Sequence, residues 1–327
     1  LMRHEAGLAN FDTSIDMEDL FTENIKQNAV GRIIEGHAPT YTTSGVKREY
    51  HALTRGWIAN EVFRRVDPAG RTIGEFMREE ISEPLGADVV IGVSEREMAR
   101  ISPVHTLGFG YQLLQGLLPR SLGRRIVHNI FQILGRLLRI VPSVIRSRRT
   151  GAPPPLAGRS SMGFFNEPDF AKGETPSANA SCSARGLAKL GAMMSAGGRL
   201  GGREFLSEGA WRAVHEHPLK ALMGGMLTTR FTQGGVDCFA PCTPESTQAE
   251  RDFNEGREGF YGWMGFGGSI FQWHPELDIG FAFVPTSLHA LDFFNERGKR
   301  YQAEVLKCVA AMNTAPLGSP TGAPREH

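Results

Sequence analysis

Cysteine is scarce in this 327-residue chain, which carries four of them, at Cys182, Cys238, Cys242 and Cys308. Four scattered cysteines do not make a disulfide scaffold, so we expect reduced thiols and favour an intracellular protein, cytoplasmic or mitochondrial, over a secreted one. Cys238 and Cys242 are close enough in sequence to share a metal ion, but no second Cys/His pair at ligand spacing follows them. The sequence therefore predicts no metal site.

Long apolar runs and an excess of one charge are also missing. The chain has no stretch of about 18 apolar residues, so no transmembrane helix is expected. The 36 Lys and Arg residues nearly balance the 35 Asp and Glu residues, and a net charge of +1 gives no reason to expect a nucleic-acid partner. A hydrophobic content of 41% argues against global disorder.

Acidic residues are absent between residues 98 and 166, although the chain as a whole is balanced. Within this span a basic insertion, at about 103–155, alternates apolar stretches with arginines. One interpretation is a peripheral membrane contact through Arg136, Arg139, Arg146 and Arg148. The other is an inserted helical cap whose arginines face solvent. Both interpretations stay open at this point.

Several common catalytic motifs are missing as well. The chain has no Gly-x-Ser-x-Gly, Walker loop, dinucleotide fingerprint or His-Glu-x-x-His. No cofactor is therefore expected.

Apolar residues recur at helical spacing in four places. They predict helices over 53–66 and 72–81, a third over 183–194, and a short one that carries Trp211. A further amphipathic helix is expected near the end of the chain, at about 294–312.

The pattern changes period in the last quarter of the chain. Residues 269–273 and 279–284 have the composition of two strands joined by a short turn, which predicts an antiparallel hairpin. Residues 313–327 are expected to form a disordered tail. The predicted chain thus begins with helices, continues with a β-hairpin and ends with a further helix. This order indicates the α+β class.

Four segments, in this order and spacing, resemble a known family. They read LMRHEAGL at 1–8, YHALTRGW at 50–57, PSAN and then ARGLA between 176 and 188, and GWMGFGGS at 262–269. They are similar to the LLxHxSGL stretch, the tyrosine motif, the helix entry before the last sheet strands, and the third motif of the serine β-lactamase-like hydrolases. That family includes class C β-lactamases, penicillin-binding proteins and related esterases.

The resemblance covers about residues 1–290 and implies an antiparallel sheet flanked by helices, with an all-helical subdomain. We expect one incomplete β-lactamase-related domain over 1–312, with the helical subdomain at about 53–160 and the sheet region at about 161–290. Its N-terminal strands and nucleophile helix are expected to be missing, because the chain starts inside the LLxHxSGL-like stretch.

The family's mechanism is acyl transfer by a serine in a Ser-x-x-Lys motif, aided by the motif tyrosine and by backbone N–H groups that form an oxyanion hole. Carried over, the resemblance makes Tyr50 the general base or proton relay, since a phenol beside a lysine ammonium has a lowered pKa. Trp263 and Gly265 would occupy the third motif, with Gly265 permitting close approach of the strand to the substrate. His51 and Asn179 are candidates for the cleft wall.

Two positions depart from the β-lactamase pattern. Ala52 replaces the asparagine of Tyr-x-Asn, and Trp263 replaces the lysine of Lys-Thr-Gly. The removed groups grip the amide and carboxylate of a β-lactam, so antibiotic hydrolysis is disfavoured and small esters or amides become the expected substrates.

The nucleophile is the larger departure, because the family's Ser-x-x-Lys lies upstream of the LLxHxSGL stretch. The sequence Ser44-Gly45-Val46-Lys47 fits the letters, but it lies in a predicted loop, whereas a nucleophile must begin a buried helix to be held in place. We expect the nucleophile to lie outside this chain.

Alternative interpretations remain. Ala52, Trp263 and the basic insertion favour a non-catalytic family member that binds a ligand, contacts a membrane surface, or assembles into filaments or another homo-oligomer. A truncated and unstable product, with uncovered sheet edges, is a further alternative.

Overall fold

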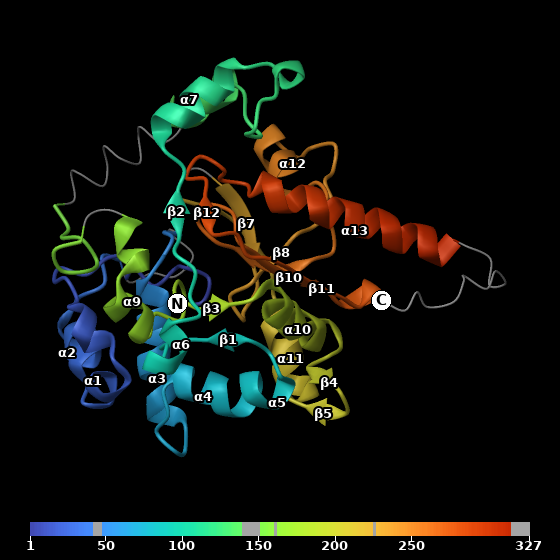
Figure 1. The fold of residues 1–327 in the computed structure, drawn as a ribbon. Coiled ribbons are helices and arrows are strands. Elements are labelled where there is room, and N and C mark those ends of the chain that lie inside the picture. The colour runs from blue at the N-terminus through green and yellow to red at the C-terminus, as the bar shows by residue number, and fades with distance from the viewer. Residues whose placement is uncertain (42–47, 139–150, 160–161, 225–226, 315–327) are drawn as a thin grey trace.

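The computed structural model describes residues 1–41, 48–138, 151–159, 162–224 and 227–314 (Figure 1). The centre of the described chain is a six-stranded sheet in the order β11-β10-β9-β8-β7-β6. Each neighbouring pair is antiparallel, and neighbours in the sheet are neighbours along the chain. The strands are β6 (Leu219–Met223), β7 (Leu227–Phe231), β8 (Asp237–Cys238), β9 (Tyr261–Met264), β10 (Ile270–His274) and β11 (Ile279–Phe283).

The predicted hairpin is confirmed as β10 and β11, which pair from Ile270 opposite Phe283 to His274 opposite Ile279. A 3-10 turn over Pro275–Leu277 connects the two strands, and Asp278 closes it in the left-handed conformation. An aspartate tolerates this conformation better than most residues, which explains how so short a connection is made without a glycine.

Helices cover both faces of this sheet. Side chains alternate along β10, so Trp273 packs into the cluster beneath α10 (Ala184–Ser195), whereas Ile270 packs into the cluster beneath α13 (Glu296–Thr314). Gly280 of β11 touches α10 so closely that a β-carbon there would lie 2.2 Å from the Ala192 nitrogen. The predicted helices at 183–194 and 294–312 are thereby confirmed, and they form the outer layers.

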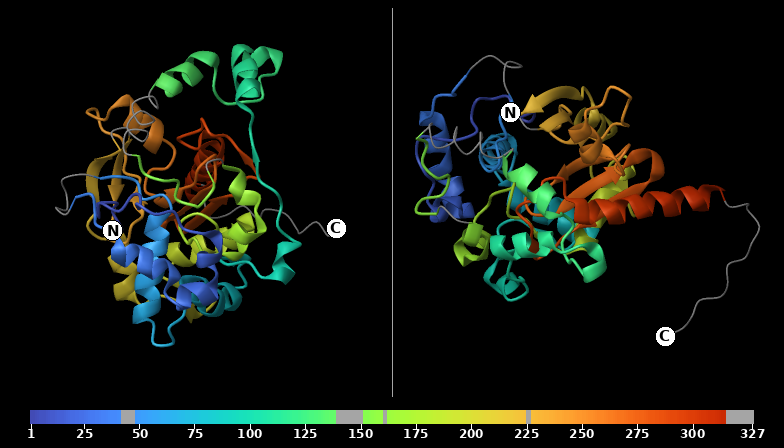
Figure 2. Two further views of the ribbon diagram at one scale, coloured as in Figure 1. Left: turned by 90° about the vertical axis from the view of Figure 1, so that its left-hand side faces the viewer. Right: turned by 90° about the horizontal axis from the view of Figure 1, so that it is seen from above.

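A second group of helices lies beside the sheet and is called the helical part below (Figure 2). It consists of α1 (Thr22–Lys26), α2 (Ala29–Gly36), α3 (Thr54–Val66), α4 (Ile73–Phe76), α5 (Glu83–Leu85), α6 (Glu95–Met98) and α9 (Pro168–Lys172). The helix predicted over 53–66 is confirmed as α3. The helix predicted over 72–81 is α4, which continues as a π-helical segment over Met77–Ser82.

The core of the helical part surrounds Trp57, which is 1% exposed. This core includes Ile25 of α1 and Phe170 of α9. Ile25 precedes residue 53, where the helical subdomain was predicted to begin, and Phe170 follows residue 160, where it was predicted to end.

Short elements complete the described chain. The strands are β1 (Val89–Val90), β2 (His105–Thr106), β3 (Ser181–Cys182), β4 (Arg199–Leu200), β5 (Arg203–Glu204) and β12 (Ser287–Leu288). The helices are α7 (Phe109–Leu117), α11 (Glu208–His215), which carries Trp211 as predicted, and α12 (Gln248–Asn254). Single 3-10 turns occupy Met17–Leu20, Arg120–Leu122 and Met162–Asn166.

A buried carboxylate joins the segments of the helical part. Glu174 is 1% exposed and accepts four hydrogen bonds. Its Oε1 accepts from the hydroxyls of Thr22, at 2.8 Å, and Thr72, at 2.7 Å. Its Oε2 accepts from Asn60 Nδ2 and from the Gly74 backbone N–H, each at 3.0 Å. Three segments, at residue 22, residue 60 and residues 72–74, therefore converge on the Glu174 side chain, whose two oxygens are satisfied by hydrogen-bond donors.

Glu174→Gln is predicted to destabilise the fold strongly. The amide replaces one acceptor oxygen with a donor that faces other donors, so at least two charge-assisted hydrogen bonds are lost, at a cost of about 3 kcal/mol or more in the free energy of unfolding. Urea denaturation measures this loss. Glu208→Gln, at an exposed carboxylate, is the matched control and should change the free energy by less than about 0.5 kcal/mol. Equal stability of the two variants would contradict the role of Glu174.

The basic insertion contains α7 and a further helical stretch over residues 130–138. It is attached through the parallel pairing of β2 with β12 and through a small apolar cluster centred on Ile133. A membrane contact was predicted for Arg136, but its side chain is largely buried. It forms an ion pair with Glu296 at 3.0 Å and lies over the ring of Phe294. Arg139, Arg146 and Arg148 lie outside the described residues, as do Ser44–Lys47 and the predicted tail from residue 315 onward.

In the described ranges, no helix combines the length and the hydropathy that a bilayer crossing requires.

Candidate active site

Two buried histidines fasten the N-terminal segment to the chain that leads into α3. The backbone N–H of His51 donates to His4 Nδ1 at 3.0 Å, and the backbone N–H of Leu8 donates to His51 Nε2 at 3.1 Å. His51 Nδ1 donates to the Glu49 carbonyl at 2.5 Å, which fixes its tautomer. The predicted cleft residue His51 is thus 1% exposed and acts as a packing group between two segments.

Cations surround this pair of histidines. Arg55 Nη1 lies 3.3 Å from His4 Nε2 and donates to the Gly235 carbonyl at 3.0 Å, which links α3 to the turn before β8. Burial, together with the charges of Arg55 and Arg48, lowers the pKa of His4 to about 2. His4 is therefore neutral at physiological pH.

Tyr50 lies above His4, at the junction of the helical part and the sheet. Its ring centroid is 4.7 Å from that of His4, which in turn contacts the buried ring of Phe231 on β7 at 5.0 Å. Tyr50 is the exposed member of this group of three rings, with 41% of its surface accessible, whereas His4 and Phe231 are buried. Its hydroxyl accepts a hydrogen bond of 2.9 Å from Trp263 Nε1. The structure thus brings together two residues, 213 positions apart, that the resemblance assigned to one site.

Trp263 is held from the sheet side. It lies on β9 opposite Phe271 of β10, and its ring packs against Phe231 at 4.8 Å and Phe253 at 6.2 Å. The indole N–H points toward the helical part because these two rings fix its plane. Trp263 is therefore both a packing residue and a hydrogen-bond donor to Tyr50.

Gly265 begins the turn between β9 and β10. Its backbone N–H donates to the Ser269 carbonyl at 2.8 Å, and its own carbonyl accepts from Asn295 Nδ2 at 3.0 Å. A β-carbon at this position would lie 2.1 Å from Ser269 Oγ. The Ser269 hydroxyl can rotate away from such a β-carbon, so the turn itself does not explain a glycine at this position, and the predicted approach of a substrate to Gly265 stays a prediction.

Asn179 lies away from Tyr50, inside the helical part. Its Oδ1 accepts from the Thr175 backbone N–H at 2.9 Å, and its Nδ2 donates to the carbonyls of Phe170 and Gly173 at 2.6 and 2.7 Å. The side chain is 7% exposed. The Asn179 amide thus shapes the loop that precedes β3 and contains Glu174.

The described residues include no cluster of side chains suited to binding a metal ion. No group of three or more His, Cys, Asp or Glu side chains in these ranges has the arrangement of a metal site. Burial raises the pKa of the Cys238 thiol. Burial also raises the pKa of the Cys182 thiol, to about 11, so both thiols are protonated and weakly reactive at neutral pH.

The family model for Beta-lactamase matches residues 1–306. The chain belongs to the beta-lactamase family.

The curated relative "Esterase/beta-lactamase LipL" of Mycobacterium tuberculosis (strain ATCC 25618 / H37Rv) is 24% identical over 298 residues. The alignment covers 88% of this chain and 58% of LipL, so the chain spans little more than half the length of that relative. The name of that relative combines an esterase and a β-lactamase.

Two solved structures show the same fold. A penicillin-binding protein homologue from Caulobacter crescentus matches with a TM-score of 0.62 and 22% identity, over 94% of this chain and 70% of its own. A family VIII carboxylesterase matches with a TM-score of 0.65 and 18% identity, over 93% of this chain and 69% of its own. The predicted α+β fold of β-lactamase and transpeptidase type is confirmed.

Stability should fall in mild acid because of His4. Its pKa in the folded chain is far below the ordinary value of 6.5, so protonation favours the unfolded chain, and the loss begins as the pH drops through about 6.5. Between pH 7 and pH 5 this one group removes about 2 kcal/mol from the free energy of unfolding.

His4→Asn tests this assignment, because asparagine keeps an acceptor and tolerates the positive φ of 63° at this position. Urea denaturation at pH 5, 6 and 7 should show a shallower pH dependence in His4→Asn, while His105→Asn, at an exposed histidine, keeps the wild-type slope. Parallel slopes in all three proteins would show that His4 is not the titrating group.

Proposed function

We propose that the protein carrying this chain is a serine hydrolase that cleaves small esters or amides through an acyl-enzyme, with Tyr50 as the proton relay. The contact between Trp263 Nε1 and the Tyr50 hydroxyl supports this best. It places a half-exposed phenol where the helical part meets the sheet, and beta-lactamase family membership makes acyl transfer the expected chemistry.

The hydrogen-bond inventory of Tyr50 suits a relay. A phenol has one proton to donate and two lone pairs, of which Trp263 occupies one. Among the described residues the Tyr50 hydroxyl has no other hydrogen-bond partner, so its proton and second lone pair can serve a nucleophile and a leaving group on the exposed side. The nearby guanidinium of Arg55 interacts electrostatically with Tyr50, so a positive charge stands close to the site of proton transfer.

The substrate class follows from what Trp263 contributes. An indole N–H is a neutral donor, so position 263 offers no cation to pair with a substrate carboxylate. Its aromatic face, packed beside Phe231, is better suited to an uncharged acyl or alcohol group. We therefore propose neutral esters ahead of carboxylate-bearing lactams.

Tyr50→Phe should lower kcat for a p-nitrophenyl ester by more than about tenfold, because the proton relay is lost. The assay uses the natural protein, produced from its complete reading frame. Tyr301→Phe is the matched control, since Tyr301 is exposed on α13 and should keep wild-type turnover. Unchanged turnover in Tyr50→Phe would remove Tyr50 from the mechanism.

Trp263→Phe separates the hydrogen bond from the packing. The phenyl ring retains the aromatic contacts but has no N–H, so kcat should fall by about tenfold if the donor to Tyr50 acts in the transition state. KM should change little. A rise in KM at constant kcat would instead make Trp263 a substrate-packing residue.

The nucleophile is tested directly on the natural protein. Its intact mass and N-terminal sequence show whether a Ser-x-x-Lys precedes the segment LMRHEAGL, and a fluorophosphonate probe should label that serine. A natural protein without such a serine, and without labelling, would leave Tyr50 no nucleophile to serve. The non-catalytic alternative would then take the place of the hydrolase.

A further inference from the structure

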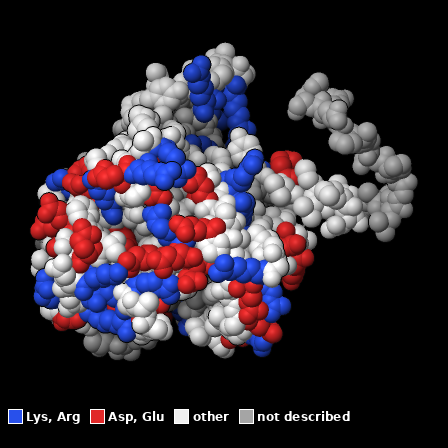
Figure 3. All heavy atoms as spheres, turned by 60° about the horizontal axis from the view of Figure 1, so that its bottom comes forward, with Lys and Arg blue, Asp and Glu red and all other residues white. Residues whose placement is uncertain are grey.

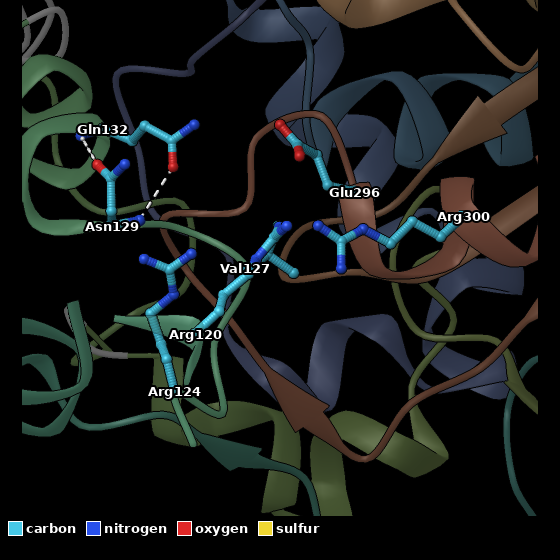
Figure 4. Close-up of a pocket in the computed structure, with 7 residues that line it drawn as sticks. All are labelled: Arg120, Arg124, Val127, Asn129, Gln132, Glu296 and Arg300. Carbon is cyan, nitrogen blue, oxygen red and sulfur yellow. Dashed lines mark hydrogen bonds between the residues drawn. The ribbon is translucent and has the colours of Figure 1, made fainter. Parts of the chain in front are cut away.

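A cavity of about 310 Å³ opens between the basic insertion and the start of α13, far from Tyr50 in the sequence and in a different part of the fold. Arg120 and Arg124 line it from the insertion, and Arg300 lines it from α13. Figure 4 shows the ends of the Arg120 and Arg300 side chains pointing toward one another. Like charges gathered in this way repel unless an anion lies between them.

The acidic group at the cavity does not neutralise these arginines. Glu296 is engaged by Arg136 Nη2 at 3.0 Å and lies 3.6 Å from His128 Nε2. In the part of the chain that the structure describes, Arg120, Arg124 and Arg300 make no ion pair. The Nε of Arg124 is buried and has no hydrogen-bond partner there. Three cations thus remain available to a ligand.

The two amides at the cavity add donors. Asn129 Oδ1 accepts from the Gln132 backbone N–H, and Gln132 Oε1 accepts from the Asn129 backbone N–H, each at 2.9 Å. This reciprocal cap begins the helical stretch 130–138 and uses the oxygens of both side chains, whereas their NH2 groups have no hydrogen-bond partner among the described residues and can donate to a ligand. A lining of guanidinium and amide donors matches the oxygens of a phosphate group.

The basic insertion that lines one side of this cavity also carries exposed apolar side chains. Phe131 and Leu138 are 81% and 73% exposed, and with Leu134 they form one face of the helical stretch, while Ile133 points inward and is 1% exposed. The 3-10 turn that carries Arg120 also carries Leu122, which is 70% exposed. Helix α7, in the same insertion, carries the exposed apolar side chains Phe109, Leu114 and Leu117.

We propose that the three arginines and this apolar face form a docking surface for a membrane that contains anionic phospholipid, with one lipid phosphate in the cavity. The apolar side chains would enter the interface beside the headgroups, and the arginines would neutralise the phosphate charge. Charge complementarity favours this occupant, because the insertion carries no acidic residue between residues 98 and 166. The face shown in Figure 3 differs, since acidic and basic side chains are interspersed on it.

Vesicle co-sedimentation of the natural protein tests the proposal. The wild type should bind phosphatidylcholine vesicles that contain phosphatidylserine or phosphatidic acid, and binding should weaken as salt is raised. The triple variant Arg120→Gln, Arg124→Gln, Arg300→Gln should bind about 100-fold more weakly, since each arginine near the surface contributes about 1 kcal/mol. The control variant Arg185→Gln, Arg199→Gln, Arg212→Gln removes the same charge from exposed positions elsewhere and should bind like the wild type.

A second variant tests the contribution of the apolar face to membrane binding. Phe131→Ser with Leu138→Ser should weaken binding to all vesicles, including pure phosphatidylcholine, because burial of apolar surface does not depend on lipid charge. Thermal unfolding identifies any variant that does not fold. If the triple variant fails this check, Arg300→Gln alone is used, with a loss of about fivefold expected.

The opposing outcomes are distinct. No wild-type binding to anionic vesicles at low salt overturns the proposal, as does equal binding by the pocket and control triple variants. Titration with inorganic phosphate and with glycerol phosphate distinguishes the source of the anion. Tight binding of these soluble ligands, without vesicle binding, would assign the cavity to a free phosphate compound and overturn the membrane surface.

Discussion

The Glu174 carboxylate is removed from water and accepts four hydrogen bonds, from Thr22, Asn60, Thr72 and Gly74. A buried carboxylate is tolerated only when its oxygens are satisfied, so each of these donors has to be in place before the helical part is stable. Asn60 lies on α3, the helix whose entry segment carries Tyr50. The position of the proposed catalytic phenol therefore depends on an interaction deep inside the neighbouring layer.

Much of the layer structure could be predicted from the sequence, because helices and strands that bury one face leave a periodic signal. The helices at 53–66 and 183–194 and the hairpin of β10 and β11 show this directly. The Glu174 cluster left no such signal, since its donors are ordinary threonines and an asparagine scattered over residues 22 to 74. The π-helical continuation of α4 was likewise not expected, because hydrophobic spacing does not separate it from an α-helix.

The residues of the candidate site that belong to motifs could be predicted from the sequence. The roles of residues that depend only on packing could not. Tyr50 and Trp263 were chosen by resemblance, and the structure places them in contact. His4 lies in the LMRHEAGL segment, but its position between the rings of Tyr50 and Phe231 depends on Phe231, which no motif marks. Asn179 was expected at the cleft from its position before α10, whereas all of its amide bonds serve a buried loop. Polarity near a motif does not reveal which way a side chain points.

The contact between α10 and β11 has a mechanical consequence. Gly191 and Gly280 let the two backbones touch with no side chain between them, and a β-carbon on Gly280 would lie 2.2 Å from the Ala192 nitrogen. Such a contact contains no flexible atoms that could absorb sliding or rotation. The helix and the sheet it covers must therefore move as one rigid body, and any breathing motion is left to the boundary with the helical part.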